Sequence, residues 1–170
     1  MSGVTAEEFK RAMASFAVGV TVVTTLDGAG APRALTATAF SSLSKTPPLC
    51  LVCVDRQSRA HAPILATRRF AINILSEEQA ALSERFADGT IEDKFAGVDW
   101  FGGIRTGCPV LPGALCSLEC ELVEVHSGGD HDIFVGRLLA VAVDSGAPLV
   151  YFRGGYAALS TSGRERERTG

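Results

Sequence analysis

Apolar and polar positions alternate over short segments along most of this chain. Such alternation favours strands of a half-buried sheet, because successive side chains of a strand point to opposite faces. The β-branched and apolar segments predict strands over residues 20–26, 34–40, 49–54, 69–75, 115–125, 133–143 and 148–152. Asp27-Gly28-Ala29-Gly30 predicts a hairpin between the first two strands, and the glycine-containing segment 127–131 predicts a second hairpin.

Helical periodicity is limited to three short segments. It predicts helices over residues 5–16, 58–66 and 77–86. The first has Thr5 before two glutamates and three apolar residues at helical spacing, which indicates a capped amphipathic helix, and Ser58 is the natural N-cap of the second. Between these elements, residues 87–106 are expected to be irregular and residues 107–114 to form a turn or an edge strand.

Six or more strands joined by hairpins, with two or three short helices, predict a mainly β fold built as a closed antiparallel barrel. The chain has 170 residues, of which 46% are hydrophobic and 21% charged, and this fits one domain with a sizeable core. We expect the domain over residues 1–162 and a mobile polar tail over residues 163–170.

The charge distribution narrows the classes of partner. The net charge is -3 and the basic residues are scattered, so the footprint of a nucleic-acid-binding protein is missing. The N-terminus lacks the pattern of a signal peptide, and the longest apolar run covers only residues 49–54, so neither secretion nor a membrane span is expected. Five cysteines, an odd number in a chain of this size, favour a reducing cytoplasm.

Two cysteine spacings resemble zinc-binding pairs, Cys50 with Cys53 and Cys116 with Cys120. Both pairs fall in predicted strands, where positions three apart face opposite ways and positions four apart are separated by about 13 Å. One tetrahedral ion cannot span either arrangement. We therefore expect structural thiols and no metal site.

Known catalytic motifs find little support. The segment from Gly28 through Gly30 resembles half of a dinucleotide-binding fingerprint, but Arg33 replaces the third glycine and a predicted strand follows where a helix is required. Neither a nucleophile elbow nor a Walker loop is present, so hydrolase and kinase functions are disfavoured.

Two segments could bind a ligand. Residues 35–42 alternate small hydroxylated and apolar side chains, so a planar heterocycle such as a flavin ring could lie on Thr36 and Thr38, with Ser41 and Ser42 near its polar rim. The alternative is a core strand with a serine-rich exit loop. In the predicted helix opening at Ser58, free amide groups with Arg56 or Arg59 could hold a phosphate, or these arginines could simply be solvated.

His131 is the strongest candidate among the three histidines. It follows two glycines and Asp130 at the expected mouth of a hairpin, where its side chain can face a ligand and the carboxylate can orient it. His126 at a strand end and His61 on a helix are weaker candidates.

Four segments together resemble a known family. They are FAVGVTVV at 16–23, LTATAFSSLS at 35–44 before Pro47-Pro48, GCPVLPGA at 107–114 before LEC at 118–120, and GDHDIFVG at 129–136, with YFRGGY at 151–156 also matching. In order and spacing they resemble the short-chain flavin reductase domain family, the reductase partners of two-component flavin-dependent monooxygenases. That family has an FMN-binding split-barrel fold of Greek-key type, and the resemblance runs from about residue 9 to residue 159.

The resemblance implies a site for each part of the ligands. It implies that the isoalloxazine ring lies along Thr36, Ala37 and Thr38, with Ser41 and Ser42 nearby, and that Cys53, Val54 and Asp55 continue this edge. It implies that Ser58 and Arg59 hold the phosphate and that Arg85 and Phe86 border the flavin. His131 and Tyr156 would lie on the nicotinamide side. It leaves the choice between FMN and FAD, and between NADH and NADPH, open.

The same resemblance implies a function. Hydride would pass from the nicotinamide to the flavin, with His131 positioning the nicotinamide, and reduced flavin would diffuse to a separate monooxygenase as a transient partner. It also implies a homodimer. Two alternatives share the fold: a non-catalytic module that binds FMN or haem, and an oxidase acting on a substrate of the pyridoxamine phosphate type.

Overall fold

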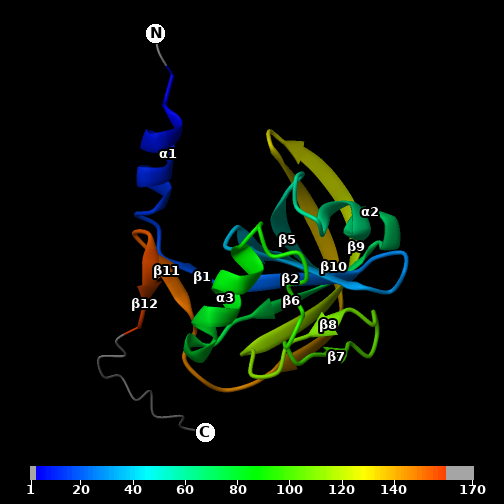
Figure 1. Cartoon of the computed structure of the whole chain (residues 1–170). Helices are drawn as coiled ribbons and strands as arrows, with labels where there is room; N and C mark the ends of the chain where they lie inside the picture. Colours follow the sequence, from blue (N-terminus) through cyan, green and yellow to red (C-terminus); the bar gives the residue numbers. More distant parts are fainter. Residues whose placement is uncertain (1–2, 160–170) are drawn as a thin grey trace, which may run out of the picture.

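The structure, a computed structural model, describes residues 3–159, so the expected domain boundary at residue 162 and the tail over residues 163–170 lie outside them. Seven strands form one sheet in which all neighbouring strands are antiparallel (Figure 1). In sheet order they are β3 (Pro32–Ala37), β2 (Thr21–Leu26), β6 (Arg69–Ile74), β9 (Cys116–Gly128), β10 (His131–Val143), β5 (Pro48–Asp55) and β4 (Phe40–Lys45).

The mainly β prediction and both predicted hairpins are confirmed. In the first hairpin Thr21 pairs with Ala37, and in the second His131 pairs with Gly128. The strand predicted over residues 34–40 is divided, because β3 ends at Ala37 and a separate strand, β4, begins at Phe40. Strand β4 is rich in serine, which has a low strand propensity, so the pattern alone does not predict it.

The expected closed barrel is wrong. Strands β3 and β4 are the two edges of the sheet, and they are not hydrogen-bonded neighbours in the strand order of the described chain. Only Thr38 and Ala39 separate these two strands, so one stretch of chain bends directly from one edge of the sheet to the other. The sheet therefore curls until its edges share a bend, and β3 reaches contact with β5 without forming a ladder.

The helices are short and peripheral. They are α1 (Ala6–Met13), α2 (His61–Thr67) and α3 (Ala80–Ala87), the last preceded by a 3₁₀ turn, η1 (Glu77–Gln79). The predicted cap of α1 is confirmed, since Thr5 and Glu8 form a capping box. The N-cap predicted at Ser58 is wrong: α2 begins three residues later, after Ala60. Across residues 3–159, every helix is too short or too polar to cross a membrane.

Strand β2 separates two hydrophobic clusters. Val23 faces the first cluster, which contains Phe70 and Phe134 and is covered at one end by Ile64 of α2. Val22 faces the second cluster, in which Phe86 of α3 is fully buried. Because successive side chains of β2 enter different clusters, both faces of this strand are buried, and it fixes α2 and α3 relative to the same sheet.

A glycine in β10 allows close packing inside the first cluster. A Cβ on Gly136 would lie 2.5 Å from Cζ of Phe70 and 3.1 Å from Cβ of Cys120. The missing side chain lets Cys50 and Cys120, from the strands on either side of β10, approach with their sulfur atoms 3.8 Å apart. All five cysteines are free thiols, of which Cys50, Cys108 and Cys120 are buried.

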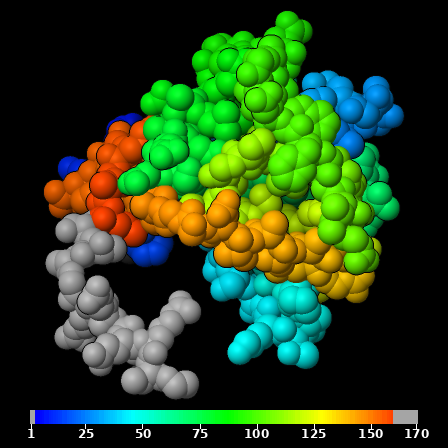
Figure 2. Space-filling view, turned by 90° about the horizontal axis from the view of Figure 1, so that it is seen from below, coloured from blue at the N-terminus to red at the C-terminus, as the bar shows by residue number. Residues whose placement is uncertain are grey.

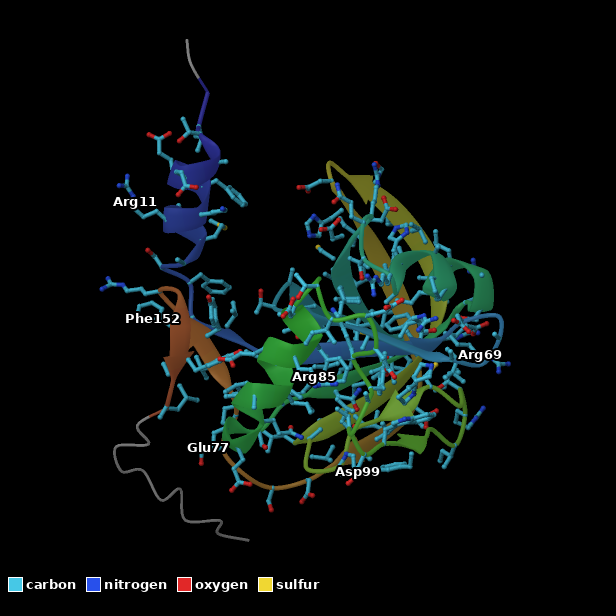
Figure 3. All side chains as sticks on the ribbon, in the orientation of Figure 1. Arg11, Arg69, Glu77, Arg85, Asp99 and Phe152 are labelled. Carbon is cyan, nitrogen blue, oxygen red and sulfur yellow. The ribbon has the colours of Figure 1, made fainter. Side chains whose placement is uncertain are left out.

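A separate arm projects from the body. It consists of α1 and a three-stranded sheet formed by β1 (Val18–Gly19), β11 (Val150–Phe152) and β12 (Gly155–Ala157), and it lies to the left of the seven-stranded sheet in Figure 1. Helix α1 has no buried residue. Figure 3 shows Arg11 on this helix pointing away from the body. The two remaining strands, β7 (Phe101–Gly102) and β8 (Pro109–Val110), pair with each other. Strand β7 lies in the segment expected to be irregular, and β8 in the segment expected to be a turn or an edge strand.

Candidate functional site

The bend between β3 and β4 is built from small, exposed residues. Thr38 and Ala39 are exposed, as are Ser41 and Ser42 on the edge strand that follows. Hydrogen bonds hold both ends of the bend: the Thr21 hydroxyl donates to the Ala37 carbonyl at 2.7 Å. The Cys53 N–H donates to the Ala39 carbonyl at 2.9 Å. The bend is thus a fixed, open surface that a flat ligand could approach closely.

The neighbouring part of β5 and β10 presents a second row of side chains. Directly paired residues of a sheet lie on the same face, and Asp55 pairs with His131 while Cys53 pairs with Ile133. These residues are partly exposed, whereas the intervening Val54 is fully buried. Cys53, Asp55 and His131 therefore line one face beside the bend, and Val54 can offer a ligand only its backbone.

His131 is held by its neighbour. Its Nδ1 lies 2.8 Å from the Asp130 carboxylate, and 41% of the His131 side chain is exposed. This hydrogen bond, with the nearby charge of His131, lowers the pKa of Asp130 below its usual value. The imidazole is therefore oriented by an ionised carboxylate while remaining accessible, as sequence reasoning expected for the mouth of the hairpin.

The turn after β5 carries the residues expected at a phosphate. Asp55 accepts the N–H of Gln57 at 2.8 Å and the Ser58 hydroxyl accepts the N–H of Ala60 at 3.3 Å, so the turn is fixed by its own side chains. Arg59 donates to the Ile91 and Glu92 carbonyls, at 3.4 and 3.2 Å. Ser58 and Arg59 thus lie together, but Arg59 also holds the loop that follows α3.

Three residues expected at the flavin have side chains that bind or pack within the protein around α3. The Thr36 hydroxyl donates to the Ser83 carbonyl at 2.7 Å and thereby attaches β3 to α3. Arg85, which Figure 3 places on α3 near the centre of the molecule, donates to the carbonyls of Asp93, Lys94 and Ala96. The Phe86 side chain is fully buried in the second cluster. These side chains already have partners within the protein, so any contact of Phe86 with a ligand is limited to its backbone.

Positively charged side chains lie where the loop after α3 meets the turn after β5. Arg59 and Lys94 line a small hollow next to Ala34 on β3, and Arg33 and the acidic Glu92 also line it. Burial, and then the charge of Arg59, lowers the pKa of Lys94. Two cations that disfavour each other in this way would gain from an anion placed between or beside them.

Tyr156 is not near the other candidates within one chain. It lies on β12 in the arm, 5.7 Å from Tyr151 between ring centroids. Figure 1 shows the arm and the start of β10, where His131 lies, in different parts of the molecule. The structure therefore brings together Thr38, Ser41, Cys53, Asp55 and His131 and leaves Tyr156 apart.

Sequence reasoning missed one charged residue beside the site. Asp132 accepts hydrogen bonds from Arg56 and lies 2.8 Å from His61, although neither His61 nor Asp132 was a prominent candidate. A signal was available: Asp132 directly precedes the strand predicted over residues 133–143 and has the same parity as Phe134, and a carboxylate at an inward position needs a partner.

Two other features lie outside this group. One hollow, of about 230 Å³, is lined by Leu26, Thr67, Arg69, Thr106 and Cys108, none of which is a candidate residue. Within residues 3–159, no three histidine, cysteine or acidic side chains are placed to hold a metal ion.

The small exposed bend, the paired residues beside it and the basic groups at one end fit a planar ligand with an anionic tail. Thr38, Ala39 and Ser41 leave room above the backbone, and Arg59 and Lys94 supply positive charge. A flavin has this shape and charge. No acid–base pair is needed on the protein for hydride transfer between two bound rings.

Comparison with known proteins gives a consistent picture. The family described as flavin reductase like domain matches residues 13–160. The chain is 45% identical to the "Probable flavin reductase" of Rhizobium meliloti, over 85% of this chain and 46% of the relative, so it spans about half of that protein's length. It is 38% identical to the flavin-dependent monooxygenase reductase subunit HsaB of Rhodococcus jostii, over 89% of this chain and 76% of the relative.

Among solved structures, the NADH:FAD oxidoreductase SgcE6 of Streptomyces globisporus, in complex with NAD and FAD fragments, superposes with a TM-score of 0.88. It is 31% identical, and the match covers 96% of this chain and 100% of that chain.

The hydrogen bonds of the two threonines near the bend predict different consequences of substitution. We expect Thr36→Val to lower the free energy of unfolding by about 1 kcal/mol, because the Ser83 carbonyl loses its donor. Thr38→Val, at an exposed position, should change it by less than about 0.5 kcal/mol. Urea denaturation of the ligand-free proteins measures both values, and equal effects of the two substitutions would contradict the assignment of Thr36 to α3 anchoring.

Proposed function

The chain belongs to the flavin reductase like domain family, and we propose that it is an NAD(P)H-dependent flavin reductase that transfers hydride to FMN or FAD. The observation that carries this proposal is the open bend at Thr38 and Ala39, which lies beside Cys53 and on the side of the sheet that also presents Asp55 and His131. A binding module would need the bend alone. The accessible, carboxylate-oriented His131 next to it favours an enzyme that must also position a second ring.

When bound, the two cofactors supply the redox chemistry, with hydride passing from the nicotinamide C4 to the flavin N5. The protein's part is to bind, orient and exclude water. In this proposal the backbone at residues 36–39 and 53–55 and the hydroxyls of Ser41 and Ser42 hold the ring, and its polar edge receives peptide N–H donors that favour negative charge. His131 positions the nicotinamide on the exposed side.

The phosphate end of the flavin is assigned to Ser58 and Arg59. The positive charge of Arg59 and its neighbour Lys94 supports this assignment, because neither side chain forms an ion pair in the described part of the chain. Arg85 is assigned to the border of the site through the loop that it fixes, and Phe86 through its backbone. The choice between FMN and FAD, and between NADH and NADPH, is left to the assay below.

We also propose that the protein is a homodimer formed through the arm. Phe9, Met13 and Phe16 are 59, 54 and 72% exposed, and α1 is an eight-residue helix, too short to be stable in water without packing. The polar face of α1 carries two acidic and two basic residues, so it offers no net charge that would attract nucleic acid or an anionic membrane. A second copy of the chain would cover this apolar face with an identical apolar face.

The dimer would also account for the position of Tyr156. Because Tyr156 lies in the arm and His131 at the start of β10, a site that contains both takes Tyr156 of the partner subunit. Figure 2 shows strands β11 and β12 of the arm, in orange-red, and the cyan β4–β5 hairpin as separate projections of the surface.

The partner in the reaction sequence is a separate flavin-dependent monooxygenase. Reduced flavin would leave the reductase and reach it by diffusion, so only a transient encounter is needed. HsaB, a relative of this chain, is named as the reductase subunit of such an enzyme. The five free thiols are in keeping with our placement of the protein in the reducing cytoplasm.

The decisive experiment mixes the purified protein with NADH or NADPH and either FMN or FAD. We expect the absorbance of the reduced nicotinamide to fall only when flavin is added, and the relative rates identify the preferred pair. Flavin binding without nicotinamide oxidation would instead support the non-catalytic module. Haem binding with no effect of flavin would do the same.

His131 gives a sharper test of the site. We expect His131→Ala to raise the KM for the nicotinamide about tenfold, the effect of losing one positioned contact, with the free energy of unfolding unchanged because the side chain is accessible. His126→Ala is the matched control, since His126 is an exposed histidine of the same hairpin that also pairs with a carboxylate. Unchanged kinetics in His131→Ala would remove His131 from the site.

The arm predicts the mass in solution. Light scattering should give twice the 17.8 kDa mass of one chain, and Phe9→Glu should shift this toward the mass of one chain by placing a charge in the apolar contact. Arg11→Glu, on the side of α1 that points away from the body, should leave the dimer intact. A monomeric wild-type protein, or a dimer that survives Phe9→Glu, would overturn the arm-mediated dimer.

A further inference from the structure

A charged cluster lies on the inner side of the sheet, behind the proposed site. Asp132 accepts hydrogen bonds at Oδ1 from Nε of Arg56 at 2.9 Å and from a terminal nitrogen of Arg56 at 2.6 Å, and its Oδ2 lies 2.8 Å from Nε2 of His61. The side chains of Asp132 and His61 are only 13% and 12% exposed. Asp132 pairs with the buried Val54, so it faces inward, while the adjacent His131 faces the opposite side.

This cluster connects three parts of the chain that end at the site. Arg56 belongs to the turn after β5, His61 begins α2, and Asp132 is the second residue of β10. Arg56 also donates to the Ser127 hydroxyl at 2.5 Å. Its backbone N–H donates to the Asp130 carbonyl at 3.2 Å. The turn that holds Ser58 and Arg59 is therefore tied to the strand start that holds His131 by side chains as well as by backbone.

The carboxylate remains charged in this setting. The hydrogen bonds from Arg56, and then from His61, lower the pKa of Asp132 below its usual value. The His61 ring also packs on Phe134, with 5.2 Å between ring centroids, so α2 is held in place by both charge and contact. Buried ion pairs often add little net stability. They still fix geometry, because a conformation that leaves one of the two buried charges without its partner is strongly destabilised.

We propose that Asp132 is a positioning residue for the flavin phosphate: without touching the ligand, it fixes the turn carrying Ser58 and Arg59 relative to His131. This inference rests on the proposed flavin reductase function and its phosphate assignment. Because Asp132 faces the inner side, its removal should act only through Arg56, His61 and the turn that they hold.

The test compares FMN with riboflavin, which has the same ring and no phosphate. Quenching of flavin fluorescence gives the Kd of each ligand, and the nicotinamide assay gives KM and kcat. For Asp132→Ala we expect the Kd and KM of FMN to rise about tenfold, the effect of misplacing one charge-assisted hydrogen bond. The riboflavin Kd and the kcat at saturating FMN should remain at the wild-type values, whereas general damage to the fold would weaken both ligands equally.

Two further variants complete the experiment. Glu124→Ala is the matched control, because Glu124 pairs with His126 on the same hairpin but is 63% exposed. It should change neither ligand. His61→Ala removes one partner of Asp132 and should give the same selective loss of FMN, which keeps the proposal testable if Asp132→Ala does not fold.

The outcomes separate this inference from the proposed function. A wild-type protein that does not oxidise nicotinamide with added flavin defeats the proposed function. An active wild-type protein whose Asp132→Ala and His61→Ala variants lose FMN and riboflavin equally, or lose neither, defeats the inference alone.

Discussion

Two hydrogen bonds on either side of Thr38 hold the part of the sheet on which the proposed site depends. The Thr21 hydroxyl binds the Ala37 carbonyl and the Cys53 N–H binds the Ala39 carbonyl, so strands from both ends of the sheet order fix the same short bend. A bend between two edge strands would otherwise be mobile, because edge strands have unpaired backbone groups. Here the bend is rigid and its side chains are small. A ligand can approach the main chain without first displacing protein.

The interior is arranged so that this bend has support from below. Strand β2 is buried on both faces and carries Thr21 to the bend, while Gly136 lets Phe70 and the thiols of Cys50 and Cys120 fill the space under β10. Buried polar side chains are hydrogen-bonded within the protein. Within residues 3–159, every buried side-chain nitrogen and oxygen has a hydrogen-bond partner. The site can therefore be open without exposing the core beneath it.

The sequence predicts the long strands well, because alternation reports which face of a strand is buried. It does not predict β4, whose serines lie on an exposed edge, or the short arm strands β1 and β12, which have too few residues for any periodicity. The sequence also cannot show whether a given hydroxyl or arginine binds a ligand or another part of the protein. Thr36 and Arg85 resemble flavin-binding residues in sequence, yet the structure commits their polar atoms to Ser83 and to the loop after α3.

The arm carries two features that bear on the proposed homodimer. Helix α1 is capped at its N-terminus by Thr5 and Glu8, so its sequence specifies a helix, but nothing within residues 3–159 buries its apolar face. The capping residues satisfy the local requirements of the helix. Its exposed apolar face still lacks tertiary packing unless another surface covers it. Tyr156 lies in this same arm, away from His131. The proposed second subunit would explain both the uncovered helix and the distance of Tyr156 from His131, whereas in a monomer each feature would need a separate explanation.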